Sequence, residues 1–65
     1  MELLSPREHQ VAMLIGRGLC NKEIARELGL SVGTVKIHVH NILQKTGVRN
    51  RYAVLLLAAP MLGEA

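Results

Sequence analysis

The residues best suited to chemistry lie in segment 32–46, where a cation, an isoleucine and a histidine share one face. On a helix that turns about 100° per residue, Lys36, Ile37 and His40 come together opposite the apolar positions. Lys36 and His40 can donate hydrogen bonds to base acceptors in a DNA major groove, and Ile37 can contact a thymine methyl group. Alternatively, Ile37 is a single apolar residue on a solvated surface, which is common. The pattern alone leaves both interpretations open.

A neighbouring sector of the same segment carries side chains suited to phosphate contacts. Thr34, His38 and Lys45 fall together there, beside the face that carries Lys36. Phosphate contacts position a protein on DNA without reading its base sequence.

Metal binding and catalysis are not indicated. His38 and His40 are two residues apart on the predicted helix and point roughly 200° from each other, so they cannot share a metal ion. Cys20 has no nearby acid or base to activate its thiol, and as the single cysteine it cannot form an internal disulfide. The chain has no Asp, and its Glu residues form no obvious pair for acid–base catalysis. We therefore expect no catalytic residue, no metal, no cofactor and no small-molecule ligand.

Helix signals recur along the chain, and strand signals do not. Ser5 and Glu8 have the spacing of a capping box, and Pro6 stands at the first helical position, where its missing N–H costs nothing. These residues predict a helix over 6–17, with Gly18 as its stop.

Two more helices are predicted in the middle of the chain. Asn21 is the expected N-cap of a helix over 22–29, and Ser31 is the expected N-cap of a longer helix over 32–46. The tight turn at Gly29 between them is typical of a helix-turn-helix. The predicted fold is all-α: a four-helix bundle whose second and third helices form the helix-turn-helix, with the third as recognition helix.

The fourth helix, predicted over 51–59 with Asn50 as cap, is apolar in every direction. One arc holds Val54, Leu55 and Ala58, and the opposite arc holds Ala53, Leu56 and Leu57; either could face the core. Because one face must remain uncovered, we expect it to form a dimer interface, assigned to Ala53, Leu56 and Leu57. The alternative is that the segment around Met61 and Leu62 folds back over it.

Length and charge narrow the class of partner. The 65 residues form one small domain, and Tyr52 is the only aromatic residue, which argues against modules that stack single-stranded bases. Residues 1–27 balance four cations against four carboxylates, whereas residues 28–63 hold four cations and no carboxylate. This asymmetry is typical of a surface that faces a polyanion, and equally of a basic face exposed to solvent.

The longest apolar run, residues 53–62, is interrupted by Pro60 and is shorter than the roughly 20 residues that a membrane helix needs. No signal peptide opens the chain. We expect no membrane association and a cytoplasmic location.

The chain resembles the LuxR/NarL-type, or GerE-type, helix-turn-helix domain of bacterial transcription regulators. The resemblance rests on Leu4-Ser5-Pro6-Arg7-Glu8, Gly18, Asn21-Lys22-Glu23-Ile24-Ala25, Leu28, Ser31, Thr34-Val35-Lys36, His38, Lys45, Gly47-Val48 and Asn50-Arg51. It spans Leu4 to about Ala59. His40 departs from the Lys or Arg that is frequent in relatives, which leaves its target base open.

The resemblance implies sequence-specific binding to double-stranded DNA through the third helix, with base contacts from Lys36, Ile37 and His40. We assign contacts to the DNA backbone to Asn21, Lys22, Ser31, Thr34, His38, Lys45 and Arg51. The resemblance also implies a homodimer on DNA, in which the two copies contact each other through the fourth helix. RNA polymerase is a further candidate partner. The domain is expected to be the C-terminal effector part of a larger regulator.

Two points remain open: the input part to which the domain is attached, and whether the domain binds DNA or another protein. The input part of a larger regulator is expected to be the receiver of a two-component response regulator, and the alternative is a small-molecule sensor of the quorum-sensing type. From a different class, the chain is a helical protein-interaction module that binds no nucleic acid.

Overall fold

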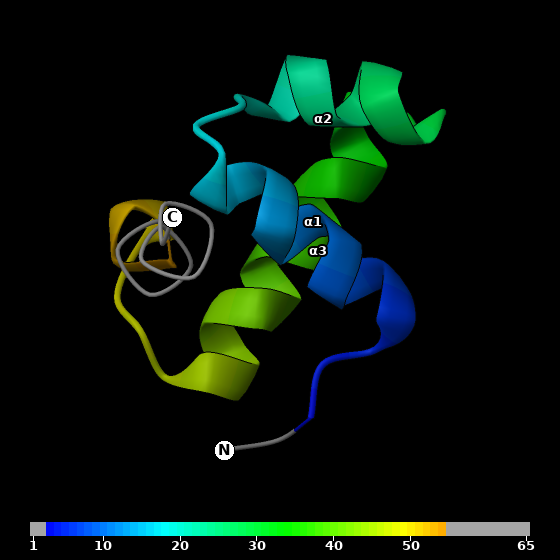
Figure 1. Ribbon diagram of the computed structural model, residues 1–65. Coiled ribbons are helices and arrows are strands. Elements are labelled where there is room, and N and C mark those ends of the chain that lie inside the picture. The colour runs from blue at the N-terminus through cyan, green and yellow to red at the C-terminus, as the bar shows by residue number, and fades with distance from the viewer. Residues whose placement is uncertain (1–2, 55–65) are drawn as a thin grey trace.

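The structure, a computed structural model, describes residues 3–54. It contains α1 (Pro6–Gly16), α2 (Asn21–Leu28) and α3 (Val32–Thr46), and a fourth helix that begins at Arg51 and is described as far as Val54 (Figure 1). Residues 3–54 include no strand. The predicted all-α fold with four helices is confirmed. The remainder of the predicted helix over 51–59, including Leu56 and Leu57, lies outside the described residues.

The capping box predicted at the start of α1 is present. The backbone N–H of Glu8 donates to Ser5 Oγ at 3.1 Å, and the backbone N–H of Ser5 donates to Glu8 Oε1 at 2.9 Å. At the other end, α1 stops one residue before the predicted Arg17. The chain then turns at Gly18, whose φ of 88° is in the left-handed region that favours glycine.

The start of α2 differs from the prediction, because Cys20 and not Asn21 is the N-cap. The backbone N–H of Cys20 donates to Glu23 Oε1 at 2.8 Å, and the carbonyl of Cys20 accepts from the N–H of Ile24 at 2.9 Å. The Asn21 side-chain oxygen, which would have served as the cap, instead accepts a hydrogen bond from Arg51. The side-chain oxygen that the local sequence predicted as the helix cap is therefore hydrogen-bonded to a residue far away along the chain.

The boundaries of α3 are those predicted. Ser31 is its N-cap: Ser31 Oγ accepts from the backbone N–H of Thr34 at 3.1 Å and donates to Thr34 Oγ1 at 2.9 Å. Gly29, with φ 68°, ends α2 in the left-handed conformation and brings the chain directly to this cap. The layout of α2, tight turn and α3 is that of a helix-turn-helix.

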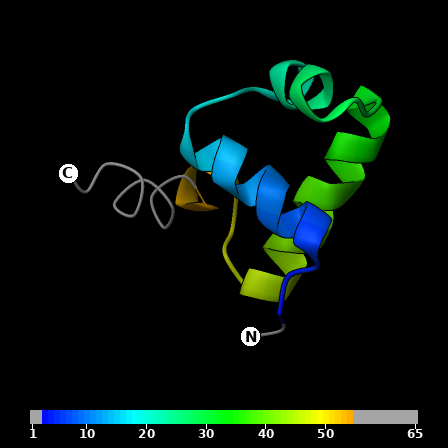
Figure 2. The same ribbon diagram turned by 45° about the vertical axis from the view of Figure 1, so that its right-hand side comes forward.

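The core lies where α1 and α2 pack against α3. Its buried apolar side chains among the described residues are Val11, Leu14, Ile15, Ile24, Ala25, Val35, Ile42 and Val54, with Val39 and Leu43 partly buried against them. This confirms the predicted inward face of the third helix. In both views of the ribbon, α3 runs behind α1 from the end of α2 toward the turn before the fourth helix (Figure 1, Figure 2).

The first turn of the fourth helix is capped and packs one side chain into the core. Asn50 caps it as predicted, since Asn50 Oδ1 accepts from the backbone N–H of Ala53 at 3.1 Å. Val54 is buried in the core with 5% of its surface exposed, whereas Ala53 is half-buried. Val54 therefore faces the core, and this first turn lies beside the C-terminal end of α1 (Figure 2).

An ion pair joins the beginning of α1 to the last turn of α3. Lys45 Nζ lies 2.7 Å from Glu8 Oε1, and the side chains are 27% and 6% exposed, respectively. Although residues 28–63 contain no carboxylate, Lys45 therefore has a counter-ion from the first half of the chain. Its carboxylate comes from a helix 37 residues away along the chain, a pairing that no local pattern signals.

The Glu8 carboxylate gives the fold a dependence on pH. The hydrogen bond from Lys45 and then that from the Ser5 backbone hold the pKa of Glu8 below its ordinary value of 4.5. Because the folded-state pKa is lower than the unfolded one, the stabilisation is complete above the unfolded value and is lost as pH falls through the folded value. We expect the melting temperature to fall as the pH drops below the ordinary Glu8 pKa of 4.5, and to fall less in Glu8→Gln.

Thermal unfolding followed by circular dichroism at a series of pH values measures this difference. Glu27→Gln is the matched control, because Glu27 is exposed and makes no ion pair among the described residues. Glu23, whose pKa is lowered by the Cys20 backbone N–H, contributes in the same pH range. A Glu8→Gln variant with the same acid sensitivity as wild type would contradict the role assigned to this ion pair.

Candidate nucleic-acid interface

One side of α3 is exposed along its length. The exposed residues at this helical spacing are Gly33, Lys36, Ile37, His40 and Gln44. Ile37 exposes 61% of its surface, although isoleucine is among the residues most often buried. The structure thus brings together the three predicted base-contacting residues, Lys36, Ile37 and His40, on one face, which we call the reading face.

The reading face is directed away from the body of the domain. The buried residues Val35 and Ile42 lie on the side of α3 against which α1 and α2 pack, and the reading face is on the opposite side. A B-DNA major groove, about 12 Å wide, admits an α-helix. The 15 residues of α3 span about 22 Å, so the helix can enter such a groove with its side chains against base edges.

The N-terminal turn of α3 offers polar groups at the edge of the reading face. Ser31 is exposed and Thr34 is half-buried, and their hydroxyls are already hydrogen-bonded to each other. His38, one turn further along, is half-buried; its Nδ1 is buried and has no hydrogen-bond partner within the described residues. The ring nitrogen that remains for an external acceptor is Nε2.

Three of the seven predicted backbone contacts bond to residues far away along the chain, whereas Ser31 and Thr34 bond to each other within the first turn of α3. Lys45 is paired with Glu8, and the Arg51 guanidinium donates to Asn21 Oδ1 and, at 3.0 Å, to the carbonyl of Leu19. Arg51 and Asn21 are 30 residues apart, so their sequence neighbourhoods carry no signal of this contact. Because Asn21, Lys45 and Arg51 join distant segments of the fold, we propose Lys22, Ser31, Thr34 and His38 as the contacts to the DNA backbone.

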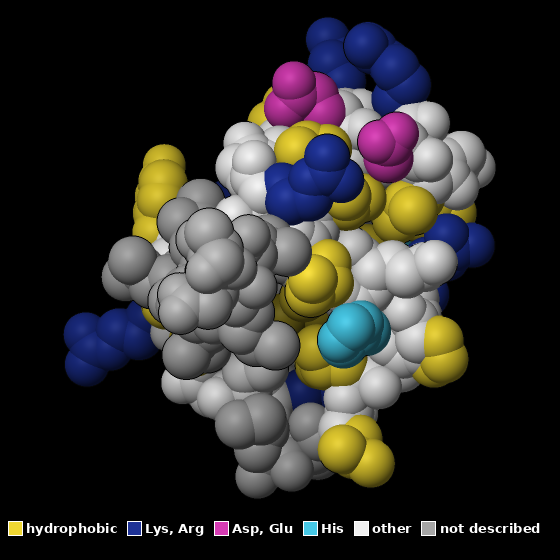
Figure 3. Space-filling view, viewed as in Figure 1, with side chains coloured by type: hydrophobic (Ala, Val, Ile, Leu, Met, Phe, Trp, Pro, Cys, Tyr) yellow, Lys and Arg dark blue, Asp and Glu magenta, His cyan; other side chains and the backbone are white. Residues whose placement is uncertain are grey.

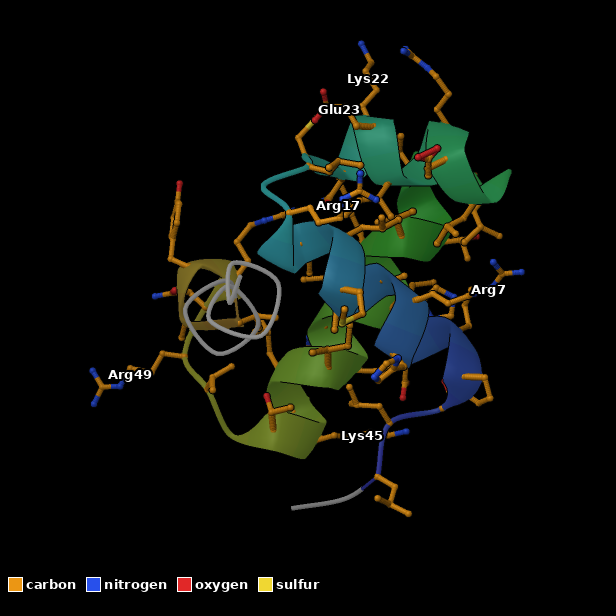
Figure 4. All side chains as sticks on the ribbon, in the orientation of Figure 1. Arg7, Arg17, Lys22, Glu23, Lys45 and Arg49 are labelled. Carbon is orange, nitrogen blue, oxygen red and sulfur yellow. The ribbon has the colours of Figure 1, made fainter. Side chains whose placement is uncertain are left out.

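The surface of α2 is mixed in charge. Lys22 and Arg26 alternate with Glu23 and Glu27, and all four are exposed. Carboxylates and cations appear together over α2 in the space-filling view, and Lys22 extends away from the domain beside Glu23 (Figure 3, Figure 4). This side lacks the single-sign field that attracts a polyanion, whereas the described reading face carries Lys36 and no carboxylate.

Arg49 is the remaining exposed cation of the second half. It follows α3 and extends outward from the turn before the fourth helix, on the opposite side of the molecule from Arg7 (Figure 4). The cations predicted to act at one interface are therefore divided: Lys36 is on the reading face, Arg49 is beyond the end of α3, and Lys45 and Arg51 are engaged within the fold. Within residues 3–54, no helix is long and apolar enough to span a bilayer.

Comparison with known proteins agrees with this geometry. Residues 2–58 match the family described as bacterial regulatory proteins, luxR family. The chain is similar to the transcriptional regulatory protein UhpA of Salmonella typhimurium, with 53% identity over 47 residues, which cover 72% of this chain and 24% of that protein. It is 44% identical over 55 residues to the nitrate/nitrite response regulator protein NarP of Escherichia coli, covering 85% of this chain and 26% of that protein.

A third relative is the two-component response regulator PprB of Pseudomonas aeruginosa, which is 42% identical over 57 residues, covering 88% of this chain and 21% of that protein. The chain thus spans about a quarter or less of the length of these relatives.

Proposed function

This chain belongs to the luxR family of bacterial regulatory proteins, and from that premise we propose that it reads a specific operator with the exposed face of α3. A domain of this family is a DNA-binding helix-turn-helix domain of a transcription regulator, and this chain is such a domain. The finer assignment is that Lys36, Ile37 and His40 contact base edges in the major groove, while Lys22, Ser31, Thr34 and His38 contact the DNA backbone.

The observation that carries this proposal is the reading face itself. Ile37 is 61% exposed between Lys36 and His40, whereas every other isoleucine of the described chain is almost fully buried. An exposed apolar side chain costs little when it stands alone, but here it is flanked by two hydrogen-bond donors in the direction opposite the core. Hydrogen-bond donors on either side of an apolar side chain suit a base-pair step whose major groove presents guanine acceptors beside a thymine methyl group.

We further propose that the domain acts as a dimer through the fourth helix. Val54 faces the core, and by helical periodicity Leu56 points away from it, with Ala53 and Leu57 on either flank of that outward direction. Two copies joined there would place two recognition helices in successive major grooves about one helical turn apart, on half-sites about 10 base pairs centre to centre.

The wider setting of the domain is also a proposal. The three relatives are named as regulatory or response regulator proteins, and this chain covers only 21% to 26% of each. We propose that it is the C-terminal effector part of a two-component response regulator that works in the cytoplasm, with RNA polymerase as a further partner. A ligand-sensing regulator is the alternative source of such a domain.

Titration against duplex DNA tests the function directly. Duplexes selected from a randomised pool by the 65-residue chain should share a common half-site, and they should bind more tightly than random duplexes at equal salt. The logarithm of the affinity should fall linearly with the logarithm of salt concentration, with a slope of about 0.9 for each phosphate neutralised. Absence of duplex binding at low salt would contradict the proposal and favour a protein-interaction module.

Leu56→Glu tests the dimer surface. Placing a carboxylate on an apolar contact between two copies should abolish cooperative occupation of paired half-sites while leaving binding to a single half-site within about twofold. Footprinting on paired and single half-sites measures both. Gln10→Glu, the same charge change at an exposed position of α1, should leave cooperativity unchanged; a Leu56→Glu variant that behaved like this control would move the dimer surface elsewhere.

A further inference from the structure

Arg51 connects the first turn of the fourth helix to the N-terminus of α2. Its Nη1 donates to Asn21 Oδ1, and its Nη2 donates to the backbone carbonyl of Leu19 at 3.0 Å. The Arg51 side chain is half-buried, beside a hollow lined by Leu19, Cys20 and Tyr52 among others. The two acceptors lie on either side of Cys20, the residue that caps α2.

The shape of the guanidinium suits this bridge. Its planar fork presents two N–H groups in fixed directions, and here each of its two terminal nitrogens has its own acceptor. A lysine at this position would keep the charge and most of the length, but its single nitrogen on a flexible stem would not hold two acceptors in a defined plane. The contact therefore depends on the geometry of the side chain as well as on its charge.

Arg51 and Val54 attach the fourth helix in different ways. They are three residues apart and therefore lie on the same side of the helix. The burial of Val54 draws this side toward the core, but apolar contact has no preferred direction. Hydrogen bonds are directional, so the two bonds of Arg51 restrict how the helix is rotated and tilted against α2.

The end of α2 that receives these bonds is rigidly connected to the recognition helix. Ile24 and Ala25 of α2 are buried in the same core as Val35 of α3, and the turn at Gly29 is short. A change in the direction of the fourth helix relative to α2 is therefore also a change relative to α3.

We propose that Arg51 is a positioning residue that sets the angle between the fourth helix and the helix-turn-helix, and thereby the half-site spacing that a dimer accepts. The inference rests on the proposed function, because spacing has a meaning only when the fourth helix joins two copies on DNA. Arg51 itself makes no DNA contact in this account. Its loss should alter spacing and cooperativity and leave base preference unchanged.

The first measurement is the helix angle in solution, which needs no DNA. Residual dipolar couplings of the 15N-labelled chain give the orientation of residues 51–54 relative to α2. We expect this orientation to change in Arg51→Lys and to stay as in wild type in Arg49→Lys, which makes the same substitution at an exposed residue two positions earlier. An unchanged angle in Arg51→Lys would overturn the positioning role.

The second measurement is binding to paired half-sites at centre-to-centre distances that vary by single base pairs. Wild type should bind cooperatively at one distance. Arg51→Lys should lose cooperativity there by on the order of tenfold, or shift its preferred distance, while its affinity for a single half-site stays within about twofold. Arg51→Lys with wild-type cooperativity at the wild-type distance would overturn the inference.

These outcomes are distinct from failure of the proposed function. Wild-type chain that binds no duplex contradicts DNA reading by α3, and wild-type chain that binds without cooperativity contradicts the dimer. In either case the measured helix angle alone decides whether Arg51 positions the fourth helix. If Arg51→Lys does not fold, Asn21→Ala, which removes one acceptor and retains the guanidinium, should produce the same change in angle and spacing.

Discussion

Replacing Lys36 with alanine is expected to weaken binding to the preferred operator by about 1–3 kcal/mol, which is roughly 5-fold to 150-fold, and to relax the choice of base at one position. Lys36 is the exposed cation at the middle of the reading face, and it has no carboxylate partner among the described residues. Its ammonium group can therefore donate hydrogen bonds to an acceptor on DNA. Titration of wild type and variant against the selected operator, and against operators changed at single positions, measures the loss and its location.

Lys22→Ala is the matched comparison, since Lys22 is an exposed cation of α2 that we assign to the DNA backbone. Its loss should weaken specific and random duplexes by similar factors and reduce the salt slope by about 1. Lys36→Ala should instead weaken the operator more than random DNA. If both variants lost affinity equally for the operator and for random DNA, the two lysines would have the same role, and the assignment of Lys36 to base contacts would be wrong.

Replacing Ile42 with alanine is expected to destabilise the domain by about 2–5 kcal/mol, enough to unfold much of it at room temperature. Ile42 has no exposed surface and lies in the core between α3 and the helices packed on it. A domain of this size has a stability of only about 3–5 kcal/mol from a single core, so one cavity consumes most of it. Urea unfolding followed by circular dichroism measures the difference.

Ile37→Ala is the matched control for Ile42→Ala. It removes the same atoms from the same helix, but at a position that is 61% exposed, so it separates the effect of burial from that of residue type. Its stability should remain within about 0.5 kcal/mol of wild type, while its affinity for an operator that presents a thymine methyl group should fall. An Ile37→Ala variant as unstable as Ile42→Ala would show that Ile37 belongs to the core of the protein in solution.

The helices were predictable because their signals are local. Ser5 with Glu8, and Ser31 ahead of Thr34, satisfy helix termini within three residues, and the structure confirms both caps. The inward and outward faces of α3 followed from helical periodicity alone, since a core needs one apolar side. Asn21 was the exception. Its side chain was equally suited to capping a helix, but it accepts a hydrogen bond from Arg51, 30 positions away.

The residues to which the structure gives a contact within the fold share one feature. Lys45 was assigned to the DNA backbone from its helical sector, and Arg51 together with the residues of the family resemblance. Their hydrogen-bond partners, Glu8, Asn21 and the Leu19 carbonyl, come from the first half of the chain. The balance of charge within one half of a sequence does not show which cations are free. A cation that has an acceptor within the fold has fewer donor groups left for DNA.

The sequence by itself determined the helices, their order, the helix-turn-helix and the residues of the reading face, because caps, glycine turns and periodicity act over a few residues. Tertiary structure decided which polar groups bond within the fold, and that Val54 of the fourth helix faces the core. It assigned Lys45 to Glu8, Arg51 to the start of α2 and Val54 to the core. These choices depend on distances between segments far apart in the chain, and only packing sets such distances.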